Sequence, residues 1–218
     1  MMNAMKKKTG CILISILVLI FAICAFALSH MDSKLEYHLT DEQILSLREM
    51  YPICGIKKPE NVSMRDMPLK EVKERFDSFV QGEVIGEKSI FTKKVSTGDI
   101  ELDKKRKANG IKDEYEFFEY TIQIVKDTEN KFEKGEQIKL VGSSLYEEYY
   151  PEFTNGMEVV IPVIADKNKG ERFSYSVMGT YYVTDEGYAI SAFDESTAQM
   201  RTSYNGIKVE DLLKQLKK

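Results

Sequence analysis

The segment from Tyr115 to Asp127, YEFFEYTIQIVKD, carries the clearest secondary-structure signal in the chain. Tyr120, Ile122 and Ile124 fall at every second position, and the segment is rich in β-branched and aromatic residues. Such a period of two is typical of a β-strand with one buried face. The segment therefore predicts a strand and points to a β-rich domain around it.

Segments of similar character lie on either side, separated by glycines and turn residues. The expected strands, in chain order, are 79–87, 115–127, 136–141, 157–165, 172–178, 180–184 and 188–193. Pro162 cannot donate to a ladder, which favours an edge strand or a bulge at that point. Because no long helices intervene, the fold class is mainly β, a small barrel or sandwich of about seven strands rather than a βαβ arrangement.

Short helices are expected around these strands. Thr40 and Gln43 form a capping-box pair in front of apolar residues at helical spacing, and Pro68 stands at the start of a second such pattern. The predicted helices are 41–50, 69–77 and an amphipathic helix at the C-terminus. The polar stretch 97–112, between the first two strands, is expected to be a mobile loop.

The N-terminal region predicts a membrane-targeting segment. Residues Cys11 to Leu28 are apolar except for Ser15, and their 18 residues would reach roughly 27 Å as a helix, close to the thickness of a bilayer core. Lys6, Lys7 and Lys8 precede this run, so the positive-inside bias places the N-terminus in the cytoplasm and the main domain outside. A single-pass protein of the cell membrane is the first expectation.

Two other fates of this segment stay open. Ala25-Phe26-Ala27 offers a signal-peptide cleavage site, and cleavage after Ala27 would release a secreted protein. Cys24 suggests lipidation, but the bulky Ile23 in front of it argues against that reading. The resulting division is a basic arm (1–10), a transmembrane or signal segment (11–30), a juxtamembrane stalk (31–67) and an extracytoplasmic β-rich domain (68–218).

Charge restricts the class of partner. The chain carries 31 basic and 35 acidic side chains, a formal charge of −4, and the part after Lys8 carries −7. Nucleic-acid binding depends mainly on Lys and Arg, so nucleic acid is not expected as a partner. A membrane, and a protein or an envelope polymer, are the partners that fit.

The strand order resembles a known group of domains. It is carried by Phe79-Val-Gln-Gly-Glu-Val, Tyr120-Thr-Ile-Gln-Ile-Val-Lys-Asp, Lys134-Gly-Glu-Gln-Ile-Lys-Leu, Asn155-Gly-Met-Glu-Val-Val-Ile-Pro-Val and Gly179-Thr-Tyr-Tyr-Val-Thr-Asp-Glu-Gly-Tyr. Over residues 79–193 the chain is similar to small OB-like β-barrel domains in uncharacterised exported proteins of Gram-positive bacteria. The resemblance implies a fold and an extracytoplasmic address, and it brings no activity or site residues.

Catalytic motifs are not expected. The two histidines, His30 and His38, both lie beside the predicted membrane segment, so neither histidine-based catalysis nor a zinc site is indicated. Asp166 to Glu171 has oxygen ligands spaced as at the start of a calcium loop, but the spacing then departs from that pattern and favours a hairpin turn. No catalytic residue, metal or cofactor is therefore assigned.

Two groups of residues are candidates for binding. Four aromatic residues surround Pro151, and they could either stack on sugar rings or anchor a protein partner, or fold back to close the end of the barrel. A run of four cations lies in the polar stretch 97–112, where it could contact anionic lipid or envelope polymer, or remain a solvated loop. The candidates are Tyr146, Tyr149, Tyr150 and Phe153, and Lys104, Lys105, Arg106 and Lys107.

Together these features predict a membrane-anchored extracytoplasmic protein that acts as a non-catalytic binding or interaction module at the cell envelope. One alternative is an envelope hydrolase using paired carboxylates such as Glu147 and Glu148. Another is a structural subunit of a surface assembly, paired through the helix at 41–50 or through Cys54, which is the one cysteine outside the apolar run.

Overall fold

The computed structural model describes residues 35–55, 65, 67–165, 170–193 and 204–218. Residues 36–218 form one compact unit, divided from residues 1–35. The predicted spanning segment, its cleavage site and Cys24 lie outside the described residues. Within the ranges just given, no helix has the length and apolar character needed to cross a bilayer.

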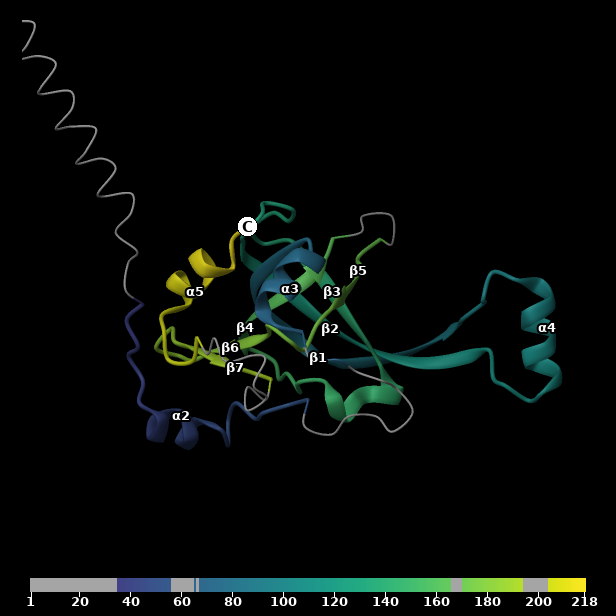
Figure 1. The fold of residues 1–218 in the computed structure, drawn as a ribbon, viewed down its shortest axis with the longest axis horizontal. Coiled ribbons are helices and arrows are strands. Elements are labelled where there is room, and N and C mark those ends of the chain that lie inside the picture. Colours follow the sequence, from purple (N-terminus) through teal and green to yellow (C-terminus); the bar gives the residue numbers. More distant parts are fainter. Residues whose placement is uncertain (1–34, 56–64, 66, 166–169, 194–203) are drawn as a thin grey trace, which may run out of the picture. The chain divides into compact units, whose positions relative to one another are not determined.

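In the described residues, seven strands form one mixed sheet (Figure 1), which confirms the predicted mainly β class and the expected number of strands. They are β1 (Ser78–Lys94), β2 (Glu114–Asp127), β3 (Gln137–Ser143), β4 (Glu158–Ile164), β5 (Arg172–Tyr175), β6 (Tyr181–Val183) and β7 (Ala189–Ser191). Their order is β1-β2-β3-β5-β4-β6-β7, and β1 also pairs with β4. Hydrogen bonds therefore run in a closed ring through β1, β2, β3, β5 and β4. The β3–β5 pair is parallel, and the other strand pairs are antiparallel.

The alternation that predicted β2 corresponds to its burial. Tyr120, Ile122 and Ile124 are almost completely buried, whereas Thr121 is half-buried and Val125 exposed. Each aliphatic side chain removed from water in this way contributes about 1.5–3 kcal/mol before entropic costs. One face of β2 thus belongs to the core of the ring.

Gly82 lies in the part of β1 that pairs with both β2 and β4. The register between β1 and β2 shifts between Gln81 and Gly82, which marks a β-bulge. A Cβ at Gly82 would lie 2.4 Å from Ile122 Cγ2, so a side chain does not fit there. The bulge lies within the part of β1 that pairs with β2 on one side and β4 on the other, where a local bend helps to close the ring.

Of the two alternatives predicted at Pro162, the edge strand was wrong because β4 has neighbours on both sides, and the register between β4 and β1 shows no bulge there. On one side β4 pairs with β1 along most of its length. On the other it pairs with β6 at residues 158–160 and with β5 at 163–164. Pro162 lies where this second neighbour changes, so its missing N–H removes no ladder bond, and its carbonyl accepts the Ser176 N–H at 3.3 Å.

Two helices pack on the sheet. They are α3 (Leu69–Arg75) and α5 (Val209–Leu216), and the second is the amphipathic helix predicted at the C-terminus. α5 buries its apolar residues, which include Leu212 and Leu216. Lys73 of α3 donates to the Gln215 carbonyl of α5 at 2.7 Å, which ties the two helices together.

The segment before the sheet is part of the folded unit. Helix α2 (Asp41–Leu47) begins with the predicted capping box and has no buried residue. After it, Tyr51 and Cys54 are buried, and the Cys54 N–H donates to the Ala192 carbonyl at 2.7 Å. Residues assigned to a stalk by sequence thus contribute to the core.

The stretch 97–112 contains a helix, so the expectation of a loop there was wrong. α4 (Ile100–Ala108) starts at Asp99, whose carboxylate accepts the N–H groups of Glu101 and Leu102. It joins the far ends of β1 and β2, where Ser89–Lys94 pairs with Glu114–Glu119. At the base of this extension, residues 117–119 of β2 also pair with β3, and only beyond them do β1 and β2 continue as two strands alone. Figure 1 shows the extension with α4 at its end. We call residues 89–119 the arm and residues 93–112 its tip.

Candidate functional site

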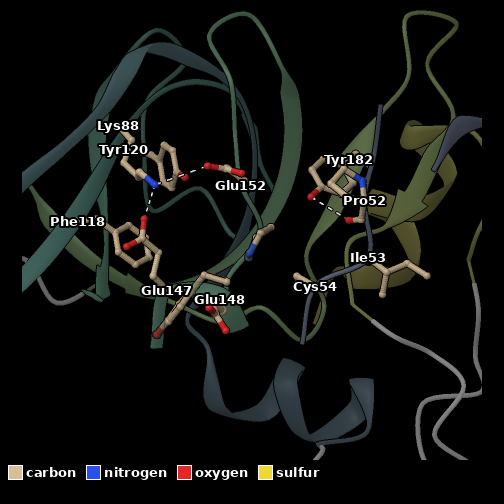
Figure 2. A pocket seen from close by; sticks show the side chains of 12 residues that line it. Pro52, Ile53, Cys54, Lys88, Phe118, Tyr120, Glu147, Glu148, Glu152 and Tyr182 are labelled. Atoms are coloured by element: carbon tan, nitrogen blue, oxygen red, sulfur yellow. Dashed lines mark hydrogen bonds and ion pairs between the residues drawn. The ribbon is translucent and has the colours of Figure 1, made fainter. Parts of the chain in front are cut away.

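A pocket of about 380 Å³ opens beside the ring (Figure 2). Its walls come from β1, β2, β6, the segment 52–54 and the connection between β3 and β4, which includes the 3₁₀ helix η1 (Ser144–Tyr149). The volume lies in the range of small-molecule sites in proteins. The lining combines four charged side chains, Lys88, Glu147, Glu148 and Glu152, with four aromatic ones, Phe118, Tyr120, Tyr150 and Tyr182.

The position of the pocket follows from two strand features. Phe118 and Tyr120 are successive residues on the buried face of β2. Lys88 lies in β1 between Ile85 and Ser89, where the register with β2 shifts. This irregularity separates the ring from the arm and leaves the lysine half-buried at the pocket rather than within a regular ladder.

Lys88 organises the charged side of the pocket. Its ammonium donates to the Glu147 carboxylate and lies 3.7 Å from that of Glu152 (Figure 2). The hydrogen bond to Glu147 raises the pKa of Lys88 above its ordinary value. The lysine is therefore a cation at neutral pH, held between two carboxylates, while Glu148 is exposed at the same opening.

Two tyrosines of the aromatic wall, Tyr120 and Tyr182, are held by hydrogen bonds to backbone groups. The Tyr120 hydroxyl accepts the Phe153 N–H at 3.4 Å, and the Tyr182 hydroxyl donates to the Pro52 carbonyl at 3.2 Å. Burial raises the pKa of both tyrosines. Tyr150 is only half-buried, so its ring is the aromatic surface most available to a ligand.

Tyr175 adds a buried polar group next to this wall. Its ring centroid lies 5.3 Å from that of Tyr150, and burial raises its pKa well above the ordinary value. Within the described part of the chain, its hydroxyl makes no hydrogen bond. Such groups are uncommon in folded proteins and require an explanation.

Cys54 lines the pocket without being suited to nucleophilic chemistry. Only 8% of the residue is exposed, and burial raises the pKa of its thiol to about 12. The reactive form of cysteine is the thiolate, which is therefore scarce at neutral pH. The same burial argues against the disulfide between two chains that the sequence left open.

The structure separates the two groups of predicted binding residues. Of the four aromatic residues, Tyr149 and Phe153 are buried, Tyr150 lines the pocket, and Tyr146 is half-buried in η1. The basic run lies on α4 in the arm, away from this pocket. Its lysines, Lys104, Lys105 and Lys107, are exposed, whereas Arg106 is half-buried and donates to the Tyr115 hydroxyl at 2.9 Å.

Sequence reasoning missed most of the pocket. Lys88, Phe118, Tyr120 and Tyr182 come from three strands, and no local motif links them. One signal was available, since the alternating pattern of β2 puts two large aromatic residues on the face expected to be buried. That signal identifies core residues and does not indicate that a pocket lies beside them.

Other predicted chemistry can be located in part. His38 stacks on Tyr188 with ring centroids 5.4 Å apart and does not line the pocket. Asp166 to Lys169, which open the suspected calcium loop, lie outside the described residues. Among the residues that are described, no group of three or more His, Cys, Asp or Glu side chains could hold a metal ion.

Comparisons with known proteins add no assignment. The chain matches no protein-family model, no curated protein and no solved structure. Its function must therefore be inferred from its own residues.

Proposed function

We propose that this protein is a membrane-anchored extracytoplasmic binding module without catalytic activity, and that it binds sugar units of an envelope polymer in the pocket beside the ring. The observation that carries the proposal is the pocket itself, which is lined by the half-buried ring of Tyr150, by three carboxylates and by the ammonium of Lys88. Sugars present hydroxyl groups to charged acceptors and a flat apolar face to aromatic rings.

The strand arrangement supports an OB-like barrel as the architecture of this module. A closed ring of five strands with one parallel pair is compatible with a small Greek-key barrel of this kind. OB folds bind oligosaccharides as well as oligonucleotides. The excess of acidic side chains favours the uncharged ligand over the polyanionic one.

The apolar run from Cys11 to Leu28 supports the proposed address. Retention of this run would hold the module at the outer face of the membrane, and cleavage after Ala27 would release it. The intact mass of the exported protein, together with its membrane or soluble fractionation, distinguishes these two forms. A cytoplasmic location of residues 36–218 in a protease-accessibility experiment would contradict the proposed address.

The charge arrangement gives less support to the hydrolase alternative. A glycosidase places two carboxyl groups on either side of a scissile bond, one of them with a raised pKa. Here the Lys88 ammonium stands between Glu147 and Glu152 and contacts both. This arrangement fits hydrogen bonding to a ligand better than acid catalysis.

Binding can be tested with residues 36–218, which form a compact unit with their own core. N-acetylglucosamine oligomers should shift the NMR signals of the Ile53 methyl groups and of Tyr150, both at the pocket. Glu152→Gln should weaken binding about tenfold, the effect of losing one hydrogen bond to a charged group. The control is Glu133→Gln, an exposed glutamate that does not line the pocket.

Two results would count against the pocket proposal. One is the absence of shifts at Ile53 and Tyr150 with every neutral sugar oligomer tested. The other is equal affinity of the Glu152→Gln and Glu133→Gln proteins for an oligomer that does bind. Release of shorter sugars during the titration would instead favour the hydrolase.

A further inference from the structure

The arm tip forms a second surface, which shares no residue with the pocket. Ile100, Leu102 and Ile111 expose 73%, 46% and 46% of their surface there. Ile100 and Ile111 also line a hollow of about 340 Å³, together with lysine side chains that include Lys104 and Lys107. Apolar and cationic groups thus occur side by side on a surface that the rest of residues 36–218 does not cover.

Charge is distributed unevenly between the tip and the rest of the unit. Residues 93–112 contain seven basic and three acidic side chains, a net charge of +4. Residues 36–218 contain 27 basic and 34 acidic side chains, or −7, which leaves −11 outside the tip. An anionic surface would therefore attract the tip and repel the remainder of the unit.

The arm holds its tip away from the ring. Beyond Phe117, the last arm residue of β2 that pairs with β3, three further residue pairs lead to Lys94, a length of roughly 10 Å. At the base, the Phe91 and Phe117 rings stack with centroids 5.6 Å apart, and the Arg172 guanidinium lies 4.1 Å from the centre of the Phe91 ring. These contacts fix the direction of the ribbon at the point where it leaves the ring.

We propose that the arm tip docks on the surface of an anionic lipid bilayer, with the lysines of α4 at the headgroups and Ile100 and Leu102 in the interface. Cations near an anionic bilayer and apolar side chains inserted beneath its headgroups contribute together to such binding. The exposed apolar side chains favour a bilayer over a soluble polyanion, because a polymer in water would leave them uncovered. The proposal agrees with the membrane address proposed above and does not depend on the pocket.

Lys105 and Lys107 provide the sharpest test. Both are exposed, and within the described residues neither side chain makes a hydrogen bond or an ion pair, whereas Lys104 pairs with Glu101 at 2.8 Å. Residues 36–218 lack the apolar run, so binding of this fragment to vesicles is measured without a contribution from that run. Co-sedimentation should show binding to phosphatidylcholine vesicles that contain phosphatidylglycerol and little binding to vesicles of phosphatidylcholine alone.

The double substitution Lys105→Ala, Lys107→Ala should lower the partition coefficient on the anionic vesicles about thirtyfold, the effect of removing two cations near the surface. The matched control is Lys126→Ala, Lys131→Ala, which removes two exposed lysines outside the arm and should leave binding unchanged. Ile100→Ser should weaken binding about fivefold, and this loss should persist at high salt, where charge is screened.

Several outcomes would overturn the proposal. These are equal binding to neutral and anionic vesicles, or unchanged binding after the double substitution. Binding to soluble polyphosphate that matches binding to vesicles and is insensitive to Ile100→Ser would identify a polymer instead. If the tip substitutions abolish self-association in sedimentation velocity but leave vesicle binding unchanged, the partner of the tip is a second copy of the chain. Failure of the sugar titration bears only on the pocket, since the two assays use different ligands and variants.

Discussion

The ring and the arm are built from the same two strands, yet different interactions hold them. In the ring, Val84 and Ile122 are paired across β1 and β2 and are completely buried. In the arm, Lys94 and Glu114 are paired across the same strands and are exposed. Ladder hydrogen bonds thus continue for several residues beyond the core, supported at the base by a few aromatic and charged contacts. The comparison shows that strand pairing extends further than the packing that stabilises the fold.

The ring and the arm tip therefore have different roles: the ring carries the interactions that stabilise the fold, and the tip carries a net positive charge. The ring contains the packed side chains that support the pocket, and the tip carries the cations and uncovered apolar groups. Changes in the ring should therefore alter the free energy of unfolding of the whole unit. Changes in the tip should act locally, because α4 contributes no buried residue.

The largest effect is expected from a cavity in the ring. Ile122→Ala should lower the free energy of unfolding by about 3 kcal/mol, because it removes a fully buried side chain from the core. The control is Ile90→Ala in the arm, where Ile90 is 62% exposed. This substitution should lower the free energy of unfolding by less than about 0.5 kcal/mol. Urea denaturation measures both values. Similar costs at the two positions would contradict the comparison between ring and arm.

An intermediate effect is expected where the arm joins the ring. Glu119, which is 7% exposed, accepts from Lys139 at 2.9 Å and from Arg172 at 2.7 Å. Burial raises the pKa of the Glu119 carboxyl. The hydrogen bonds from Arg172 and Lys139 lower this pKa by more than burial raises it, so the pKa lies below the ordinary value of 4.5. Glu119→Gln should cost about 2 kcal/mol at neutral pH, where these bonds involve a charged acceptor.

The pH dependence has a definite sign. Because the folded pKa of Glu119 lies below its unfolded pKa, the carboxylate contributes stability above pH 4.5 and loses it as the pH falls through the folded value. The difference in unfolding free energy between wild type and Glu119→Gln should therefore narrow below pH 4.5. Thermal unfolding at a series of pH values measures this difference. A constant difference down to pH 2 would show that the carboxylate charge is not responsible.

The smallest effect on global stability is expected at the tip. Asp99→Ala removes the side chain that caps α4, a contribution of about 1 kcal/mol to the helix. Hydrogen exchange of the amides in the first turn of α4 should accelerate about fivefold, while the urea midpoint of the unit stays nearly constant. The control is Asp113→Ala, because Asp113 is an exposed aspartate of the same arm that does not cap α4. Equal loss of protection throughout the ring would contradict a local effect.

Short-range patterns in the sequence accounted for most of the secondary structure. The alternation at Tyr120, Ile122 and Ile124 predicted β2, and the pair Thr40 and Gln43 predicted the capping box of α2, as observed. Both depend on backbone geometry within a few residues. The helix α4 was missed because the stretch 97–112 is polar and contains Asn109-Gly110, so its central basic run suggested a solvated loop. The cap at Asp99 was the available sign of a helix start.

By itself, then, the sequence determined a mainly β unit with about seven strands and a C-terminal helix, and it predicts a membrane address. These follow from spacing, composition and charge along neighbouring residues. Only the tertiary structure decided that β1 closes on β4, that Pro162 lies inside the sheet, and that Lys88 meets Glu147 across 59 positions of the chain. Ring closure and the pocket depend on contacts between distant segments. Their geometry is fixed when the core packs, and no local pattern of residues encodes it.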